Sequence, residues 1–221
     1  IAAHVLEADA GDIEFANGRF VIAGHDRAIG IMELAQKIHG GLKLPADVPQ
    51  SLDVDHVSDG VPAAYPNGCH IAEVEIDPET GVTDVVSYMS VSDFGTVLNP
   101  LMVEGQVHGG VVQGIGQALM ELTAYDDDGQ LLTGSYMDYA MPRAKNAPPF
   151  VVINHPVPAK TNPLGVKGCG EAGCAGGLAS VMNAVADALS EYGITNINMP
   201  ATPQRVWAAI QDAKAKGGKA A

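Results

Sequence analysis

The sequence predicts an α+β fold in which mixed or antiparallel sheets pack against helices. Strand-like segments with alternating apolar residues come as hairpins, and segments with helical apolar spacing lie between them without a repeated βαβ order. The 221 residues are 47% hydrophobic and 17% charged, which is typical of a globular chain with a sizeable core. No apolar run approaches the ~18 residues of a membrane-spanning helix, so we expect no membrane span.

The first elements are a hairpin and a helix. Residues 12–23, DIEFANGRFVIA, alternate apolar and polar side chains around Asn17-Gly18, a pair that favours a two-residue hairpin turn. In the following IGIMELAQKIHGG, a helix is expected to end at Gly40. Its apolar residues recur at helical spacing: Ile31, Leu34 and Ile38.

A long connection is expected to divide the chain. Residues 41–68 are rich in proline, aspartate and serine, a composition typical of loops and linkers. We therefore predict two parts, a hairpin–helix segment at residues 1–60 and a C-terminal part at residues 61–221.

The second part begins with two strands and a glycine-rich helix. The strands lie in HIAEVEIDPETGVTDVVSYMSVSD and are joined by a turn at residues 78–81. A helix is expected from Asn99 to near Leu122, with glycines at positions 105, 109, 110, 114 and 116. Because glycine in a helix costs about 1 kcal/mol relative to alanine, we expect another helix or a ligand to approach this backbone closely.

Three further elements complete the prediction. A short strand is expected at residues 150–155, FVVINH. A helix that ends at Gly193 has an apolar face made of Leu178, Val181, Met182, Val185 and Leu189. Thr202 and Pro203 are typical of the start of a last helix, in which three residues are expected in the core: Val206, Trp207 and Ile210.

Charge and cysteine content disfavour several kinds of site. The net charge is −14 and the only basic cluster is the tail KAKGGKAA, so we expect no nucleic-acid-binding surface. The three cysteines, Cys69, Cys169 and Cys174, form no C-x-x-C pair. Neither a zinc site nor an iron–sulfur cluster is therefore expected within the chain. A reducing, cytoplasmic compartment is the default expectation.

The stretch GVKGCGEAGC, residues 165–174, is the main candidate for a functional loop. It contains G-x-G-x-x-G, but a dinucleotide-binding fingerprint requires a strand that leads directly into the first glycine. Three prolines separate residues 150–155 from this loop, which disfavours that interpretation. A helix N-terminus beside Lys167 would instead suit an anionic ligand or oxyanion close to Glu171. In a purely structural alternative, Glu171 only favours the helix dipole and the glycines only allow tight packing.

Two glycine-rich stretches, read together, resemble one protein family. They are NPLMVEGQVHGGVVQGIGQALME (residues 99–121) and NPLGVKGCGEAGCAGGLASVMNAVADAL (residues 162–189), and PATPQRVWAAI follows them. The pair G-Q-V-x-G-G-x-x-Q-G and K-G-x-G-E-A-G is similar to the C-terminal part of the molybdopterin-binding subunit of molybdenum hydroxylases. This family includes xanthine dehydrogenase, aldehyde oxidoreductase and the carbon monoxide dehydrogenase large subunit. The resemblance covers nearly the whole chain and implies the C-terminal portion of a molybdenum-cofactor-binding domain, with residues 61–221 as the molybdopterin-binding part.

The resemblance implies a cofactor and a set of site residues. The family binds molybdopterin, in bacteria usually as the cytosine dinucleotide, and the pterin dithiolene holds the molybdenum, so no protein metal ligand is expected. Glu171 matches the glutamate that acts as general base. Gln106 matches the glutamine near the metal or the pterin. The residues expected to line the cofactor with it are Gly105, Lys167, Gly168, Cys169 and Gly170.

The resemblance also implies a reaction and partners. The family oxidises an aldehyde, an N-heterocycle, a purine or carbon monoxide with oxygen derived from water, and the electrons leave through 2Fe–2S clusters and FAD on partner domains or subunits. Complete molybdenum subunits are several times longer than this chain. We therefore expect it to require the remaining N-terminal part, iron–sulfur and FAD subunits and a homo-oligomeric complex, and to be inactive alone. In the alternative, it is a non-catalytic, isolated or degenerate domain that acts in assembly or interaction.

Overall fold

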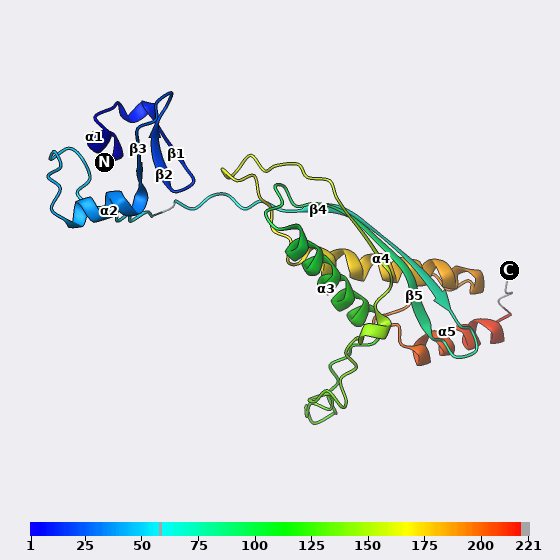
Figure 1. The fold of residues 1–221 in the computed structure, drawn as a ribbon. Helices are drawn as coiled ribbons and strands as arrows, with labels where there is room; N and C mark the ends of the chain where they lie inside the picture. Colours follow the sequence, from blue (N-terminus) through cyan, green and yellow to red (C-terminus); the bar gives the residue numbers. More distant parts are fainter. Residues whose placement is uncertain (58, 218–221) are drawn as a thin grey trace. The chain divides into compact units, whose positions relative to one another are not determined.

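The computed structural model describes residues 1–57 and 59–217 and divides the chain into two compact units, Ile1–Asp59 and Gly60–Ala221. Each unit combines a three-stranded sheet with helices (Figure 1). The predicted α+β class is therefore confirmed. The last four residues of the basic tail KAKGGKAA lie outside the described residues.

The first unit is an antiparallel sheet accompanied by two helices. Helix α1 (Ala2–Leu6) and a 3₁₀ turn (Ala10–Asp12) lead into the strands β1 (Ile13–Ala16), β2 (Arg19–Ile22) and β3 (Ala28–Gly30), and α2 (Ile31–His39) follows them. Asn17 and Gly18 have φ values of 52° and 75°, so both occupy the left-handed region that a two-residue hairpin turn requires. The predicted hairpin is confirmed.

A small apolar core holds the first unit together. Leu34, on the apolar side of α2, is buried with residues from the other elements: Ala2, Leu6, Ile22 and Ile29. Helix α2 ends at Gly40, as predicted. The described residues 40–57 and 59–66 contain neither a helix nor a strand, which agrees with the predicted long connection.

The second unit contains a mixed sheet in the order β4-β5-β6. Strands β4 (Asn67–Ile76) and β5 (Thr83–Asp93) are antiparallel, and β6 (Phe150–Asn154) pairs with β5 in parallel. The turn between β4 and β5 forms because the Asp77 carboxylate accepts hydrogen bonds from the Glu79 N–H (2.9 Å) and the Thr80 hydroxyl (2.7 Å). The sequence predicted each strand but not the parallel direction of β6.

Two long helices cover one face of this sheet. Helix α3 (Pro100–Leu119) starts at Asn99, whose side chain caps it by accepting a hydrogen bond from the Met102 N–H. Helix α4 (Ala172–Leu189) lies beside α3, and α5 (Pro203–Ala215) lies near the β4–β5 turn (Figure 1). Short 3₁₀ turns occur at Ala144–Asn146 and Ser190–Tyr192.

Four glycines allow the α3 and α4 backbones to approach closely. An added Cβ on Gly110 would lie 2.9 Å from the Cys174 nitrogen, and one on Gly173 would lie 2.6 Å from the Val107 oxygen. Gly114 and Gly177 face each other in the same way one turn further along. The sequence predicted that another helix or a ligand approaches the α3 backbone, and at Gly110 and Gly114 the approaching group is helix α4.

The helical faces and the inner face of the sheet enclose the main core. Its buried members include Tyr88, Phe94, Val111, Ile115, Val181, Val185, Leu189, Val206 and Ile210. The prediction that Trp207 belongs to this core is wrong, because its side chain is 43% exposed. One residue along a helix turns the side chain by about 100°, so the burial of Val206 directs its neighbour away from the core.

Helix α4 also bears on the membrane prediction. Among the described residues, Ala172–Tyr192 is long and apolar enough to cross a membrane, judged by length and composition alone. The expectation that no segment approaches that length therefore needs correction. Val181, Val185 and Leu189 of this segment are fully buried in the second unit, and its glycines pack on α3.

Candidate functional site

The loop that precedes α4 is fastened to the end of β5. The Thr96 N–H donates to the Gly165 oxygen (2.9 Å) and the Lys167 N–H donates to the Phe94 oxygen (3.0 Å). Gly95 has a φ of 63°, and a Cβ there would collide with the Gly165 carbonyl. The backbone contact thus requires glycine at position 95 and sets the path of the chain into residues 165–171.

Asn162 closes the same loop from within. Its side-chain Nδ2 donates to the Val166 oxygen (2.9 Å), and its Oδ1 accepts from the Val166 N–H (3.0 Å). One amide group therefore satisfies both backbone groups of Val166, as a neighbouring strand would. This gives a physical reason for asparagine in the NPLGVKG stretch.

Lys167 forms an ion pair with Asp93 at the end of β5. The Lys167 Nζ donates to the Asp93 Oδ2 at 2.5 Å, and the two side chains are 11% and 13% exposed. The Asp93 Oδ1 also accepts from the Val157 N–H (2.9 Å) and the Gly95 N–H (2.8 Å). The hydrogen bond from Lys167, followed by these two, lowers the pKa of Asp93 to about 2. The charge of Lys167 is thus already paired within the chain.

Asp93→Asn is expected to destabilise the second unit, because it leaves the Lys167 ammonium without its counterion. The folded-state pKa of about 2 lies below the ordinary value of about 3.9 for aspartate. The contribution of the carboxylate is therefore present above about pH 4 and is lost as the pH falls towards about 2. Thermal melts of both proteins should show a difference at about pH 7 that shrinks at about pH 2.5. A difference that stays constant over this range would contradict the ion-pair account.

The structure brings four of the predicted cofactor-lining residues together. Gln106, Lys167, Cys169 and Gly170 line one cavity of about 300 Å³. The Gln106 Oε1 lies 3.8 Å from the position of a Cβ on Gly170, so the amide faces the loop. The rest of the lining comes from the end of β5, the start of α3 and Val166: Phe94, Thr96, Val97, Leu98, Asn99, Met102 and Val103. The two glycine-rich stretches of the sequence thus meet at one place.

The other three predicted residues do not line this cavity. Gly105 and Gly168 are exposed, and an added Cβ on either would meet no atom within 4 Å. Glu171 is exposed at the N-cap of α4, the position just before Ala172, and its backbone is already helical (φ −101°, ψ −9°). No described residue forms a hydrogen bond with its carboxylate or with the Gln106 amide. Their roles towards a cofactor stay predictions.

Backbone N–H groups from the cavity wall into the first turn of α4 have no acceptor. Among the described residues, none accepts a hydrogen bond from the N–H groups of residues 168–174. Residues 172–174 form the first turn of α4, where N–H groups have no partner within the helix. This run and the positive end of the helix dipole suit an anionic group with several acceptor oxygens.

A second polar cluster lies between the sheet and α4, and sequence analysis missed it. His70 Nδ1 and the Tyr88 hydroxyl are 2.8 Å apart, and the Tyr88 hydroxyl lies 3.0 Å from the Ser180 Oγ. Ser180 in turn donates to the Gly176 carbonyl (2.8 Å). The available signal was weak: a histidine and several serines occupy inward-facing positions of predicted elements.

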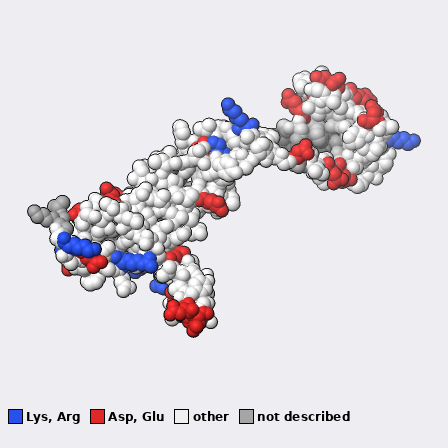
Figure 2. Space-filling view, turned by 180° about the vertical axis from the view of Figure 1, so that it is seen from behind, with Lys and Arg blue, Asp and Glu red and all other residues white. Residues whose placement is uncertain are grey.

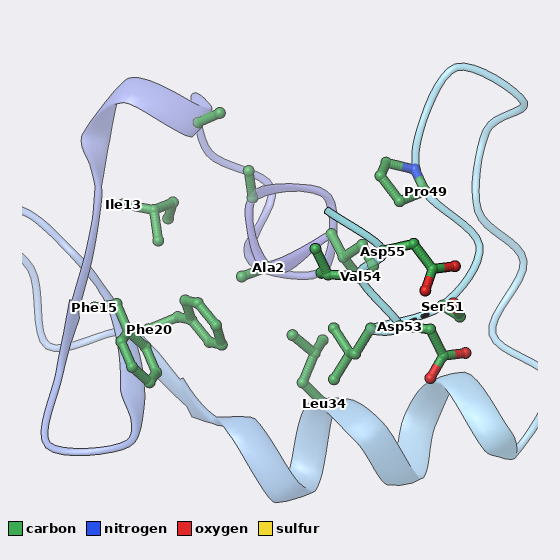
Figure 3. Close-up of a pocket in the computed structure, with 14 residues that line it drawn as sticks. Ala2, Ile13, Phe15, Phe20, Leu34, Pro49, Ser51, Asp53, Val54 and Asp55 are labelled. Atoms are coloured by element: carbon green, nitrogen blue, oxygen red, sulfur yellow. Dashed lines mark hydrogen bonds between the residues drawn. The ribbon is translucent and has the colours of Figure 1, made fainter. Parts of the chain in front are cut away.

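The first unit holds a separate apolar cavity of about 600 Å³. Its walls come from α1, the β1–β2 hairpin, α2 and residues 49–55, with Phe15, Phe20 and Leu34 turned towards it (Figure 3). The charged residues in its lining are Asp53 and Asp55. None of the predicted site residues lies there, so this cavity and the candidate site are different features.

The distribution of charge on the surface follows the composition. The chain has 26 acidic and 12 basic residues, and on the face drawn in Figure 2 the basic side chains are few, with several of them at the lower left. The local donors at residues 168–174 are the feature suited to an anion.

Residues 1–148 match the model of a protein family described as the molybdopterin cofactor-binding domain. The chain belongs to this family. The predicted relationship to the molybdenum hydroxylases, and the predicted molybdopterin cofactor, are thereby confirmed. The α+β architecture is also that of the family's solved structures.

Two relatives match this molybdopterin-binding chain over almost its whole length. The nicotine 6-hydroxylase large subunit of Paenarthrobacter nicotinovorans is 39% identical over 93% of this chain and 26% of its own. The structure of reconstituted CO dehydrogenase from Oligotropha carboxidovorans superposes with a TM-score of 0.86 at 31% identity, over 97% of this chain and 27% of its own. The chain thus spans about a quarter of the length of these relatives.

A third relative matches a smaller part of the chain. The aldehyde oxidoreductase of Megalodesulfovibrio gigas is 33% identical over 66% of this chain and 16% of its own. The similarity to the nicotine and carbon monoxide enzymes therefore extends further along this molybdopterin-binding chain than the similarity to this aldehyde enzyme.

Proposed function

We propose that this chain is the part of a molybdenum hydroxylase that holds the molybdopterin cofactor and supplies Glu171 as general base. The observation that carries this proposal is the run of unpaired N–H groups at residues 168–174. Two residues of this run, Cys169 and Gly170, line the cavity together with Gln106. Family membership supplies the identity of the anionic group that these donors would bind. The family match at residues 1–148 contains Gln106, and relatives that span 93% and 97% of the chain extend the relationship beyond it.

The residues present fit that cofactor. Unpaired N–H groups can donate to pterin and phosphate oxygens, and the exposed glycines at positions 168 and 170 leave those groups accessible. Gln106 can donate and accept without adding charge, which suits an anionic group. Asp93 offsets the charge of Lys167, and the whole chain has a net charge of −14. The backbone N–H groups are therefore the main groups that attract an anionic cofactor. We expect the cytosine dinucleotide form of the cofactor.

The chain's own contribution to the reaction is orientation and proton transfer. When bound, the molybdenum cofactor supplies the redox centre and the activation of a water-derived oxygen. Glu171 is the one carboxylate within residues 168–174, so it is the group there that can accept a proton. The Gln106 amide faces the same loop, so it can orient the bound cofactor by donating a hydrogen bond to it or accepting one from it.

The proposed substrate class is an aromatic N-heterocycle. This follows from the 39% identity to the nicotine 6-hydroxylase large subunit, which extends over 93% of the chain. Carbon monoxide is the second candidate, because the superposition with CO dehydrogenase covers 97% of the chain. A non-catalytic domain is less favoured, since Glu171 and Gln106 are both present. The proposed compartment is the cytoplasm.

Isotope labelling tests the proposed reaction. The assembled, molybdenum-loaded enzyme is incubated with a panel of N-heterocycles and an artificial electron acceptor in ¹⁸O-water. We expect a hydroxylated heterocycle that carries the label. Labelled carbon dioxide formed from carbon monoxide would favour the second candidate. A loaded enzyme that incorporates oxygen from O₂, or that oxidises neither substrate, would overturn the proposal.

The sheet of the second unit has an apolar outer face that fits a partner. Two cross-strand rows of outward side chains run over β4, β5 and β6: Cys69, Val91 and Ile153, and Ile71, Met89 and Val151. Ile71, Met89, Val151 and Ile153 are each at least 36% exposed. Sheets made only of parallel strands are usually covered on both faces, and β5–β6 is a parallel pair within this mixed sheet. We propose that a polypeptide corresponding to the remaining three quarters of the relatives covers this face, with iron–sulfur and FAD subunits in the same complex.

Cys69 provides a probe of this proposed interface. Its thiol is expected to react with a maleimide much more slowly in the assembled enzyme than after unfolding in urea, because the partner covers the outer face. Labelling is read at the Cys69 peptide by mass spectrometry. Rapid labelling of the native complex at Cys69 would contradict the proposed interface.

A further inference from the structure

Glu171 has no side-chain partner in the described chain, so its place depends on the backbone of α4. We propose that His70, Tyr88 and Ser180 are positioning residues that fix α4 against the sheet and thereby hold Glu171 in place. This inference rests on the proposed role of Glu171 as general base. It extends that role to residues outside the short K-G-x-G-E-A-G motif of residues 167–173.

Helix α4 is held from two sides near its start. On one side, Gly173 and Gly177 pack directly on the α3 backbone. On the other side, the His70 ring fills the space next to Gly176, where an added Cβ would overlap the ring and lie only 2.6 Å from its Cδ2. The imidazole of His70 therefore packs between β4 and α4, and it limits how closely the helix approaches the sheet.

Hydrogen bonds connect the His70 ring to helix α4. The Tyr88 hydroxyl lies between His70 Nδ1 (2.8 Å) and the Ser180 Oγ (3.0 Å), and Ser180 also donates to the Gly176 carbonyl. On the other side of the ring, Nε2 is 3.4 Å from the Oγ of the buried Ser90. Tyr88 is 1% exposed, so water does not substitute for these partners, and a buried hydroxyl without partners is costly.

The protonation state of His70 is compatible with hydrogen bonds to Tyr88 and Ser90. Burial lowers the pKa of His70, which favours the neutral ring. A neutral imidazole has one nitrogen that accepts and one that donates, so it can join the hydroxyls of Tyr88 and Ser90 at the same time. The connection from β4 through β5 to α4 therefore requires no buried charge.

The distance from this contact to Glu171 is short. Gly176 follows Glu171 by five residues, which is about 7.5 Å along a helix. Since a helix moves as a rigid element over such a length, a shift at Gly176 also moves the start of α4. A displacement of about 1 Å at a catalytic group can reduce the rate by about 10²-fold. Loss of the contact should therefore affect turnover more than substrate binding.

The test uses Tyr88→Phe in the assembled, molybdenum-loaded enzyme. This change keeps the buried ring and removes the hydrogen bonds to His70 and Ser180. We expect kcat per bound molybdenum to fall about tenfold, with KM and molybdenum content unchanged, and Ser180→Ala to act in the same direction. Tyr125→Phe is the matched control, because Tyr125 is 60% exposed and should leave kcat unchanged. If Tyr88→Phe does not fold, Ser180→Ala alone carries the test.

A double variant separates positioning from general structural damage. If Tyr88 acts through Glu171, adding Tyr88→Phe to Glu171→Gln should slow the enzyme no further, because the positioned group is already absent. An unchanged kcat in Tyr88→Phe, a raised KM alone, or an additive loss in the double variant would overturn this inference. If Glu171→Gln itself keeps full activity, the proposed base role fails instead, and this outcome is distinct from the others.

Discussion

Glu171→Gln in the assembled enzyme is expected to lower kcat by about 10²- to 10⁴-fold, the range over which general acid–base catalysis contributes. The amide has the size of the carboxylate but cannot accept a proton at neutral pH. Molybdenum per chain should not change, because the donors proposed to hold the cofactor are backbone N–H groups of the same loop. Steady-state kinetics and metal analysis of the same preparation measure both quantities.

Glu79→Gln is the matched control for this experiment. Glu79 lies on the turn between β4 and β5, and its carboxylate forms no hydrogen bond in the described chain. The same change of charge there should leave kcat within experimental error. A Glu171→Gln enzyme with normal kcat would exclude Glu171 as the base. A loss of activity that only follows loss of molybdenum would assign Glu171 to cofactor retention instead.

Gly110→Ala and Gly109→Ala are expected to have opposite effects on stability, although the residues are adjacent in α3. A Cβ on Gly110 meets the α4 backbone at 2.9 Å from the Cys174 nitrogen, while a Cβ on Gly109 meets no atom within 4 Å. Overpacking costs about 1–3 kcal/mol, so Gly110→Ala should lower the free energy of unfolding by about that amount. Gly109→Ala should raise it by up to about 1 kcal/mol through helix propensity.

Chemical unfolding of the two variants measures this difference. Gly110→Ala should also reduce the molybdenum content, because it separates α3 from the start of α4 and so Gln106 from Gly170. Gly109→Ala should retain normal content. Two variants with the same change in stability would show that helix propensity alone governs these positions, and the close α3–α4 contact would then be wrong.

Local patterns in the sequence predicted most of the elements. Asn17-Gly18 defines its hairpin without distant contacts, and Gly40 ends its helix as expected. Helix α4 ends at Leu189, and Gly193 ends the 3₁₀ turn that follows it. The five glycines of the α3 region predicted a close approach, and two of them make it with α4. These features depend on a few neighbouring residues, so periodicity and turn chemistry are sufficient to find them.

Contacts between distant segments could not be predicted in this way. Asp93 and Lys167 are 74 residues apart, and nothing near Asp93 in the sequence indicates its partner. The parallel pairing of β6 with β5 and the contact of His70 with Gly176 also depend on how the elements pack. The sequence predicts Trp207 in the core together with Val206 and Ile210, but only Val206 and Ile210 occupy the buried side of α5.

In the candidate site, too, the sequence predicted some features and the structure was needed for others. Resemblance supplied Glu171 and Gln106 from motifs, and the structure then placed Gln106 opposite Gly170. The unpaired N–H groups of residues 168–174 and the pairing of Lys167 with Asp93 became visible only with coordinates. The expected cationic contribution of Lys167 is accordingly smaller than its place in the loop suggested.

Molybdenum and released cytosine nucleotide are the quantities that report directly on cofactor binding by this chain. Both are measured by mass spectrometry on the purified enzyme that contains this chain. We expect close to one molybdenum and one cytosine nucleotide per chain. A folded, fully assembled enzyme with less than about a tenth of either would contradict the claim that residues 168–174 and Gln106 hold this cofactor.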